Sequence, residues 1–137
     1  MDTKKYEVNS KSLIIENIDI INELFEGDIN EIFTKLKNKN TEFENKIYES
    51  FCKKCPMSLA VTEKLINDAK GKTLKECLET EFQLSQKIVY RDDFNNGVNS
   101  VLVSKDRNPQ WQPSKLSEIN IDDINKYFEI HTEKLYL

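Results

Sequence analysis

The sequence predicts an all-α protein, with consecutive helices joined by short loops. Only three glycines and three prolines interrupt the 137 residues, and that scarcity, with abundant Lys, Glu, Leu and Ile, favours helices. Apolar residues recur at three- and four-residue steps, whereas the alternating pattern of a half-buried strand is not found. Hydrophobic residues make up 38% and charged residues 32% of the chain, so a core of modest size is expected.

The N-terminal part is expected to hold two helices in close succession. The first runs from Leu13 to Phe25, where apolar residues keep the helical spacing. Gly27 stands just past its end, as glycine often does, because it adopts the left-handed conformation without a steric cost. Asp28 is expected to cap the second helix, whose apolar stripe ends at Leu36.

Three more helices have clear start or stop signals. The third covers about residues 43–51 and ends before a proline. Cys55 then serves as the cap of the fourth helix, and Pro56 as its first residue, where the missing N–H does no harm. Thr73 opens a capping box, TLKE, that starts the fifth helix, which is expected to reach about Tyr90.

Two acidic pairs mark the last two helix starts. Asp92 and Asp93 open a sixth helix, where carboxylates favour the positive end of the helix dipole. A second pair, Asp122-Asp123, lies in the first turn of a short last helix, Ile121 to Phe128, capped by Asn120. Capping therefore explains both pairs better than acid–base catalysis does.

These elements define one helical domain, residues 13–128, between tails of residues 1–12 and 129–137. The first residues lack the continuous apolar region of a signal peptide, and no apolar run approaches the roughly 20 residues that cross a bilayer. The net charge is -4 and the pI about 5.2, with lysines interleaved among acids. That balance argues against nucleic acid as a primary partner, and we also expect no membrane partner.

Cysteine and histidine are too few for the usual chemistry of these residues. Cys52 and Cys55 form a single CxxC motif, whereas a structural zinc site takes four ligands, usually from two such pairs. The other candidates are a distant Cys77 and a single His131. We therefore expect no metal site and no Ser-His-Asp or Cys-His system. Because no signal peptide is found, the three cysteines are expected to be reduced thiols. No Gly-rich phosphate loop is found either, so no catalytic residue is predicted.

The stretch from Arg91 to Trp111, RDDFNNGVNSVLVSKDRNPQW, is the most informative part of the chain. Glycine at position 97 costs about 1 kcal/mol in a helix relative to alanine, and close approach of a neighbouring backbone is the usual compensation. We expect Trp111 to fold back over apolar surface. The helix should bury a stripe formed by Phe94, Val98, Val101 and Leu102.

Two cations follow this helix and have two possible roles. Lys105 and Arg107 lie near the helix C-terminus, where positive charge complements the dipole, before Pro109 ends the segment. Alternatively, both side chains project towards an anionic group such as a phosphate. The spacing alone favours the first role.

Four pieces of the chain, taken in order, resemble the C-terminal region of 3-hydroxyisobutyryl-CoA hydrolases, in the enoyl-CoA hydratase/isomerase (crotonase) superfamily. The resemblance covers about Leu13 to Phe128. The pieces are ENIDIINELFEGDINEIFTKL, CPMSLAVTEKLINDAKGKTLKECLETEFQLSQ, RDDFNNGVNSVLVSKDRNPQW and QPSKLSEINIDDINKYF.

The resemblance implies a helical part that lacks the β/α spiral core of the family. Such enzymes cleave an acyl-CoA thioester in valine breakdown, commonly in mitochondria, with an oxyanion hole and an acidic residue that lie in that core. The helical part covers the active site and supports subunit packing. By this likeness Phe94, Leu102, Lys105 and Arg107 are candidate CoA contacts, and no catalytic residue, metal or other cofactor is expected in the chain itself.

The partners implied are the N-terminal crotonase core or neighbouring subunits, with self-association possible through an exposed apolar face. Two other interpretations remain. The chain could belong to a non-catalytic crotonase-like structural subunit, such as a mitochondrial ribosomal small-subunit protein. It could also be a free-standing helical interaction module, which would melt cooperatively as a monomer and leave no apolar face open.

Overall fold

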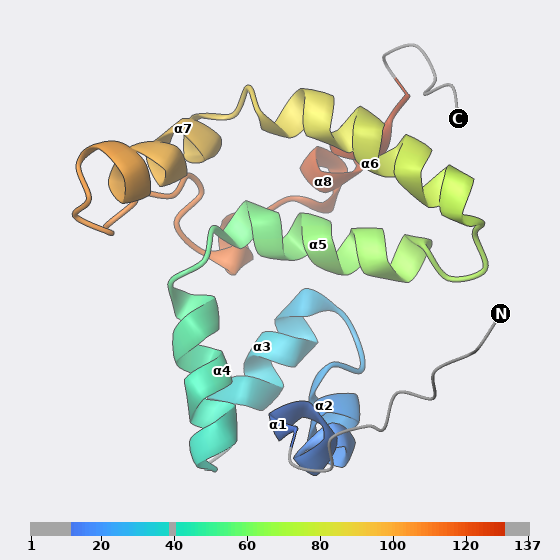
Figure 1. Ribbon diagram of the computed structural model, residues 1–137, viewed down its shortest axis with the longest axis vertical. Coiled ribbons are helices and arrows are strands. Elements are labelled where there is room, and N and C mark those ends of the chain that lie inside the picture. The colour runs from blue at the N-terminus through green and yellow to red at the C-terminus, as the bar shows by residue number, and fades with distance from the viewer. Residues whose placement is uncertain (1–11, 39–40, 131–137) are drawn as a thin grey trace, which may run out of the picture.

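A computed structural model describes residues 12–38 and 41–130 (Figure 1). The described residues form helices and connecting turns, without a strand, so the predicted all-α class is confirmed. The α-helices are α1 (Leu13–Glu16), α2 (Ile18–Leu24), α3 (Ile29–Lys37), α4 (Glu42–Cys52), α5 (Pro56–Asp68), α6 (Leu74–Ile88), α7 (Asp92–Val98) and α8 (Ile121–Phe128). A π-helix, η1 (Asn99–Val103), continues α7, and a short 3-10 helix, η2 (Leu116–Glu118), precedes α8.

The expected first helix is two helices, and that prediction was wrong. The chain leaves helical geometry at Asn17 (φ -117°, ψ 18°), between α1 and α2. The Asn17 side chain donates a hydrogen bond to the carbonyl oxygen of Leu13, 2.9 Å away. Asparagine competes in this way with the regular backbone ladder, which explains the break.

The structure confirms the predicted starts of α3, α5, α6 and α8. Gly27 has φ +109°, and Asp28 accepts from the N–H groups of Asn30 and Glu31 in a capping box. Thr73 forms the predicted box with Glu76, and this hydroxyl hydrogen bond lowers the pKa of the Glu76 carboxyl. Pro56 is the first residue of α5, and Asn120 caps α8.

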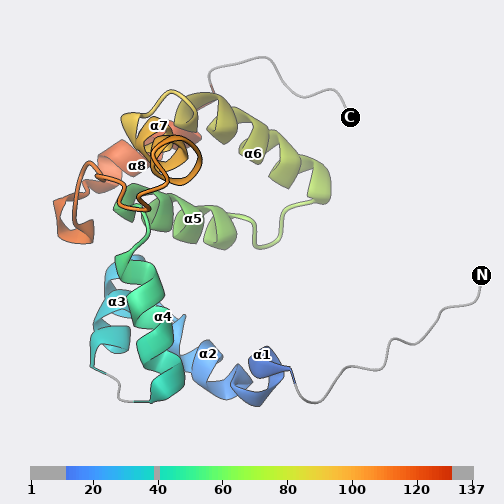
Figure 2. The same cartoon turned by 60° about the vertical axis from the view of Figure 1, so that its left-hand side comes forward.

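The helices form two lobes with separate cores (Figures 1 and 2). In the α1–α4 lobe, Leu24, Ile32 and Leu36 are buried, with Phe51 among the residues packed around them. In the α5–α8 lobe, α8 packs against both α5 and α6. The buried residues of this second core are Cys55, Met57, Ala60, Val61, Leu84 and Ile124.

The α4–α5 junction and one residue of α3 connect the lobes. Ile29, from α3, packs against the core of the α5–α8 lobe. Trp111 donates a hydrogen bond from Nε1 to the carbonyl oxygen of Lys53, 3.3 Å away, and so ties the loop before η2 to the junction. Within the described ranges, none of the helices is long and apolar enough to cross a membrane.

Candidate functional site

The candidate site is the end of the molecule formed by α7, η1 and the turn as far as Arg107, which we call the α7–η1 tip (Figure 1). All four predicted contact residues lie on it: Phe94 on α7, Leu102 on η1, and Lys105 and Arg107 in the turn. All four side chains are exposed. The structure therefore brings them to one end of the molecule.

The predicted burial of this stripe was wrong. Phe94 and Val98 are 45% and 38% exposed, and Val101 and Leu102 are 57% and 67% exposed. Val103, beside them, is also exposed. Because the stripe has correct helical spacing but is not covered by the residues that the structure describes, it forms an open apolar surface, a feature typical of interaction sites.

The turn after η1 has an unusual backbone. Lys105 and Arg107 both adopt left-handed conformations, with φ of 58° and 55°. Such a conformation costs about 1–2 kcal/mol for a residue other than glycine. The Arg107 N–H donates to the carbonyl oxygen of Ser100 (3.0 Å), and the Asn108 N–H donates to the Asp106 carboxylate (2.9 Å). Both hydrogen bonds fix the backbone of this turn, and strain and π-helical turns are often found at functional sites.

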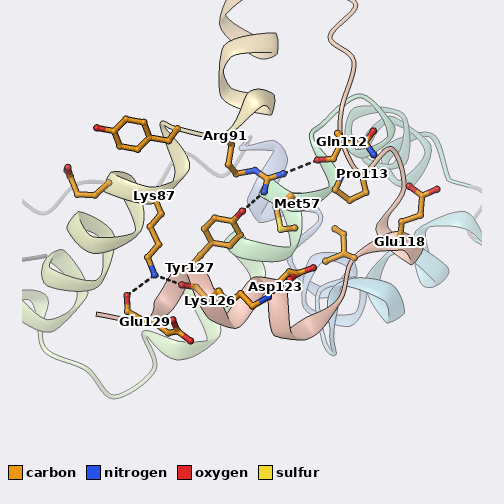
Figure 3. A pocket seen from close by; sticks show the side chains of 13 residues that line it. Met57, Lys87, Arg91, Gln112, Pro113, Glu118, Asp123, Lys126, Tyr127 and Glu129 are labelled. Carbon is orange, nitrogen blue, oxygen red and sulfur yellow. Dashed lines mark hydrogen bonds and ion pairs between the residues drawn. The ribbon is translucent and has the colours of Figure 1, made fainter. Parts of the chain in front are cut away.

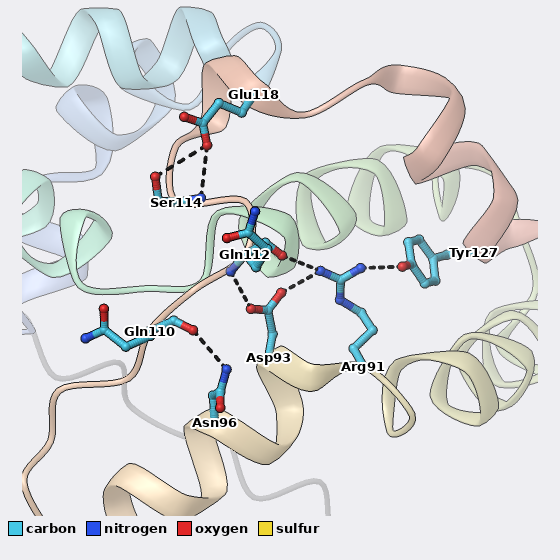
Figure 4. A network of polar contacts seen from close by, with 8 residues as sticks. All are labelled: Arg91, Asp93, Asn96, Gln110, Gln112, Ser114, Glu118 and Tyr127. Atoms are coloured by element: carbon cyan, nitrogen blue, oxygen red, sulfur yellow. Dashed lines mark hydrogen bonds and ion pairs between the residues drawn. The ribbon is translucent and has the colours of Figure 1, made fainter.

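Asp93 is buried, and its role extends beyond the predicted capping. Its side chain is 5% exposed; Oδ2 lies 2.5 Å from Nη2 of Arg91, and Oδ1 accepts the N–H of Gln112 at 2.7 Å (Figure 4). Asp92, in the same helical turn, is exposed. Sequence spacing could not show which of the two acids is buried, because Gln112, whose N–H binds Asp93, lies 19 residues further along the chain.

Arg91 is the centre of the hydrogen-bond network that Asp93 joins (Figure 4). Its guanidinium also donates to the carbonyl oxygen of Gln112 (2.9 Å) and to the Tyr127 hydroxyl, and lies 5.4 Å from the centre of the Tyr127 ring. Burial disfavours the charged form, but the hydrogen bonds to Asp93 and Tyr127 outweigh it and raise the pKa of Arg91. The network connects α7, the returning loop and α8, and so fixes the base of the tip.

Gly97 accommodates a side chain and not the neighbouring backbone that we expected. A Cβ atom at this position would lie 3.3 Å from Cη2 of Trp111 and 3.5 Å from Cζ3. Trp111 is half-buried and packs against the core of the α5–α8 lobe, so the predicted folding back of this residue is confirmed. The glycine therefore lets the indole ring approach the helix closely at the base of the tip.

A branched side chain at Gly97 should displace this ring. We expect Gly97→Leu to destabilise the protein by about 1–3 kcal/mol, as overpacking of a well-filled site typically does. The indole would become more exposed, and its fluorescence would shift to longer wavelength; Trp111 is the only tryptophan, so the signal is unambiguous. Asn95→Leu, at an exposed site of α7, serves as the control. Equal spectra for the two variants would contradict the packing described here.

A groove of about 830 Å³ lies on the other side of Arg91, between the end of α6, the loop at Pro113 and α8 (Figure 3). Several of its charged groups bind other groups of the protein itself. Lys87 donates to the carbonyl oxygens of Lys126 and Glu129 at the end of α8, while Asp123 pairs with Lys126 at 2.8 Å and raises the pKa of that lysine. The hydrogen bonds of Lys87 therefore hold α6 against the end of α8. The groove is lined by as many acidic as basic side chains.

Cys52 is exposed, Cys55 is buried, and both are free thiols, as is Cys77. Residues 12–38 and 41–130 contain no cluster of three or more potential metal-ligating side chains. His131 lies outside the described residues.

The fold matches the helical part of the crotonase fold, as two solved structures show. A carnitinyl-CoA dehydratase from Mycobacterium thermoresistibile superposes with a TM-score of 0.86 over 95% of this chain and 38% of that one, at 24% identity. An enoyl-CoA hydratase from Rhodobacter sphaeroides superposes with a TM-score of 0.82 over 89% of this chain and 36% of that one, at 20% identity.

The sequence comparisons agree, and the chain belongs to the enoyl-CoA hydratase/isomerase family, whose family model matches residues 1–128. The mitochondrial 3-hydroxyisobutyryl-CoA hydrolase of Homo sapiens is 35% identical over 121 residues, which are 87% of this chain and 31% of the human protein. The Dictyostelium discoideum protein of the same name is 35% identical over 91% of this chain and 34% of its own length. The chain thus spans about a third of the curated relatives that it matches, and both relatives are named as mitochondrial proteins.

Proposed function

We propose that this chain is the helical part of a 3-hydroxyisobutyryl-CoA hydrolase-like enzyme of valine breakdown, which covers the active site and supports subunit packing. The α7–η1 tip carries the proposal, because it combines an uncovered apolar surface with two cations in a turn fixed by hydrogen bonds. The match to about a third of each hydrolase supports it. The same relatives support a mitochondrial location.

In this proposal the tip lies over the CoA of a substrate held by the remainder of the enzyme. Phe94 and Leu102 would contact its apolar parts, and Lys105 and Arg107 its phosphates, because ammonium and guanidinium groups bind phosphate through charge-assisted hydrogen bonds. Burial of Val98 and Val101 on the core would remove their apolar area from water, which would stabilise the assembly. Thioester cleavage would require groups outside this chain.

Complementation tests the proposal directly. The human hydrolase without the region matched by this chain should be inactive, and so should this chain alone. A fusion of the two, or a mixture, should hydrolyse 3-hydroxyisobutyryl-CoA. Turnover by the purified chain alone, or a folded fusion without turnover, would refute it. The second result would favour a non-catalytic structural subunit, whereas a cooperatively melting monomer without affinity for the core would favour a free-standing module.

The two cations of the tip should affect substrate binding more than the chemical step. In the active fusion we expect Lys105→Ala with Arg107→Ala to raise KM about tenfold, because two phosphate contacts are lost, and to leave kcat nearly unchanged. Lys70→Ala, at an exposed site beyond α5, is the control. A pantetheine thioester without nucleotide phosphates should show no such dependence, and an equal effect on both substrates would contradict the assignment.

A further inference from the structure

An apolar pocket of about 220 Å³, which we call the interlobe pocket, lies between α5 and the α1–α4 lobe (Figure 1). It shares no lining residue with the α7–η1 tip or with the groove beside Arg91, so the proposed function assigns it no role. Most of its lining is apolar. The large apolar residues are Phe25, Ile29, Ile32, Phe51, Leu59 and Ile66.

The interlobe pocket is open to solvent and already formed. Phe25 and Ile66, one from each wall, are 41% and 63% exposed, whereas Ile32 is buried. Apolar surface therefore continues from the core of the α1–α4 lobe out to solvent. The Phe25 ring makes an edge contact with Phe51, and the two ring centres are 5.9 Å apart. A preformed apolar hollow of this kind is typical of a site that receives an apolar group.

Acidic side chains predominate around the pocket. Glu63 lines it, and a second surface hollow shares Gly27 with it. The charged residues of this second hollow are Glu26, Asp28, Glu31 and Lys35. Among the described residues that line the two hollows, acids thus outnumber cations by four to one. The sequence from Ser12 to Glu31 has no lysine or arginine.

Two nearby lysines bind other parts of the chain. Lys35 donates to two backbone carbonyl oxygens at and just after the end of α2. Lys64, on α5, pairs with Asp68 at 2.8 Å and lies 5.0 Å from the centre of the Phe128 ring. The surface around the pocket therefore keeps an excess of negative charge, which a basic partner would complement.

A partner that fills the pocket must be both apolar and basic, because burial of acids without a cationic partner is costly. The tip of a second copy does not qualify, since its exposed acids Asp92 and Asp106 balance Lys105 and Arg107. An extended strand is disfavoured as well, because the described residues contain no sheet edge to pair with it. An amphipathic helix with lysine or arginine beside its apolar stripe meets both requirements.

We propose that the interlobe pocket binds a basic amphipathic helix of a partner protein. A large apolar side chain of this helix enters between Phe25 and Ile66, and its lysines or arginines face Glu26 and Glu63. The inference adds an interaction to the proposed function and does not depend on it. The ionic part of the contact should weaken as salt rises, because the Debye length falls from about 10 Å at 0.1 M to about 3 Å at 1 M.

A synthetic helix tests this binding. The peptide has about 18 leucine and lysine residues, long enough to form a helix, with the leucines along one side and fluorescein at one end. Fluorescence anisotropy should show saturable 1:1 binding to the wild-type chain, and weaker binding at high salt. A peptide of the same composition with its leucines spread around the helix should bind at least about tenfold more weakly. A peptide of leucine and glutamate should not bind.

Uncharged substitutions locate the apolar contact. Ile66→Ser should weaken binding of the amphipathic peptide about tenfold, because it removes an apolar residue at the opening of the pocket. Leu74→Ser is the matched control, since Leu74 is 76% exposed on α6 and does not line the pocket. Circular dichroism confirms that each variant is folded.

Charge reversal locates the ionic contact. Glu26→Lys with Glu63→Lys should weaken binding at low salt and have a smaller effect at high salt. Glu49→Lys with Glu81→Lys changes the net charge by the same amount and does not alter a residue that lines either hollow, so it should have much less effect. This control separates the proposed contact from general attraction between an acidic chain and a basic peptide.

Absence of binding, or equal binding by Ile66→Ser and Leu74→Ser, would overturn the proposal. Self-association of the wild-type chain without peptide, lost in Ile66→Ser, would identify a second copy as the occupant instead. Displacement of the peptide by the remainder of the human hydrolase would identify the core as the occupant. Peptide binding requires neither CoA nor turnover, and Ile66→Ser should stay active in the complementation fusion. Failure of the hydrolase proposal is therefore distinguishable from failure of this one.

Discussion

Replacement of Asp93 by alanine is expected to lower the free energy of unfolding by about 3 kcal/mol. The substitution leaves the Arg91 guanidinium without its carboxylate partner and the Gln112 N–H without an acceptor. Loss of one member of a buried ion pair typically costs 3–5 kcal/mol. We expect the lower end of that range, because the Arg91 side chain is 19% exposed and lines the open groove. Chemical denaturation followed by circular dichroism measures the change.

Asp92→Ala is the matched control for this prediction. Asp92 occupies the same first turn of α7 but is exposed, so its loss should cost only the helix-dipole contribution, roughly 0.3–1 kcal/mol. Asp93→Asn keeps an acceptor for Gln112 without the negative charge and should lie between the two alanine variants. If Asp92→Ala and Asp93→Ala were equally stable, the Arg91–Asp93 network would not fix the base of the tip.

Leu36→Ala, in the α1–α4 lobe, is expected to lower the free energy of unfolding by a similar amount to Asp93→Ala. The Leu36 side chain is 1% exposed in the core of α2, α3 and α4, and truncation of such a leucine costs about 2–5 kcal/mol, partly through the cavity that remains. Because the two lobes have separate cores, we expect the loss to be concentrated in the α1–α4 lobe. Hydrogen exchange should show faster exchange of amides in α3 and α4 than in α5 and α6.

The control for Leu36 is another leucine of the same lobe. Leu13 is 63% exposed, so Leu13→Ala should change the unfolding free energy by less than about 0.5 kcal/mol in the isolated chain. Uniform acceleration of exchange in both lobes by Leu36→Ala would show that the chain unfolds as one cooperative unit. In that case the separate cores would not correspond to separate units of stability.

The predicted starts of most helices were correct, because a cap is a local event. Asp28, Thr73 and Asn120 each accept hydrogen bonds from backbone groups two or three residues later, so sequence spacing alone locates them. Asn17 shows the limit of this approach. It sits within a continuous helical stripe, and its competition with the backbone ladder was not visible in the apolar pattern.

Unlike the helix caps, the α7–η1 tip could be predicted only in part from the sequence. The stripe from Phe94 to Leu102 was recognised from its spacing, but periodicity gives only the side that is apolar and not whether anything covers it. The partner of Gly97 was misjudged for a similar reason, since Trp111 lies 14 residues later in an irregular loop. The pairing of Arg91 with Tyr127 spans 36 residues and has no signal in the sequence.

The sequence by itself determined the helical class, most of the helix caps and the family, since these depend on local spacing and on the order of residues along the chain. Only the tertiary structure decided which acid of the Asp92-Asp93 pair is buried, what lies against Gly97, and which apolar residues remain open to solvent. These three features depend on contacts between segments far apart in the sequence. The local pattern of residues is the same whichever of these contacts forms, so it does not specify them.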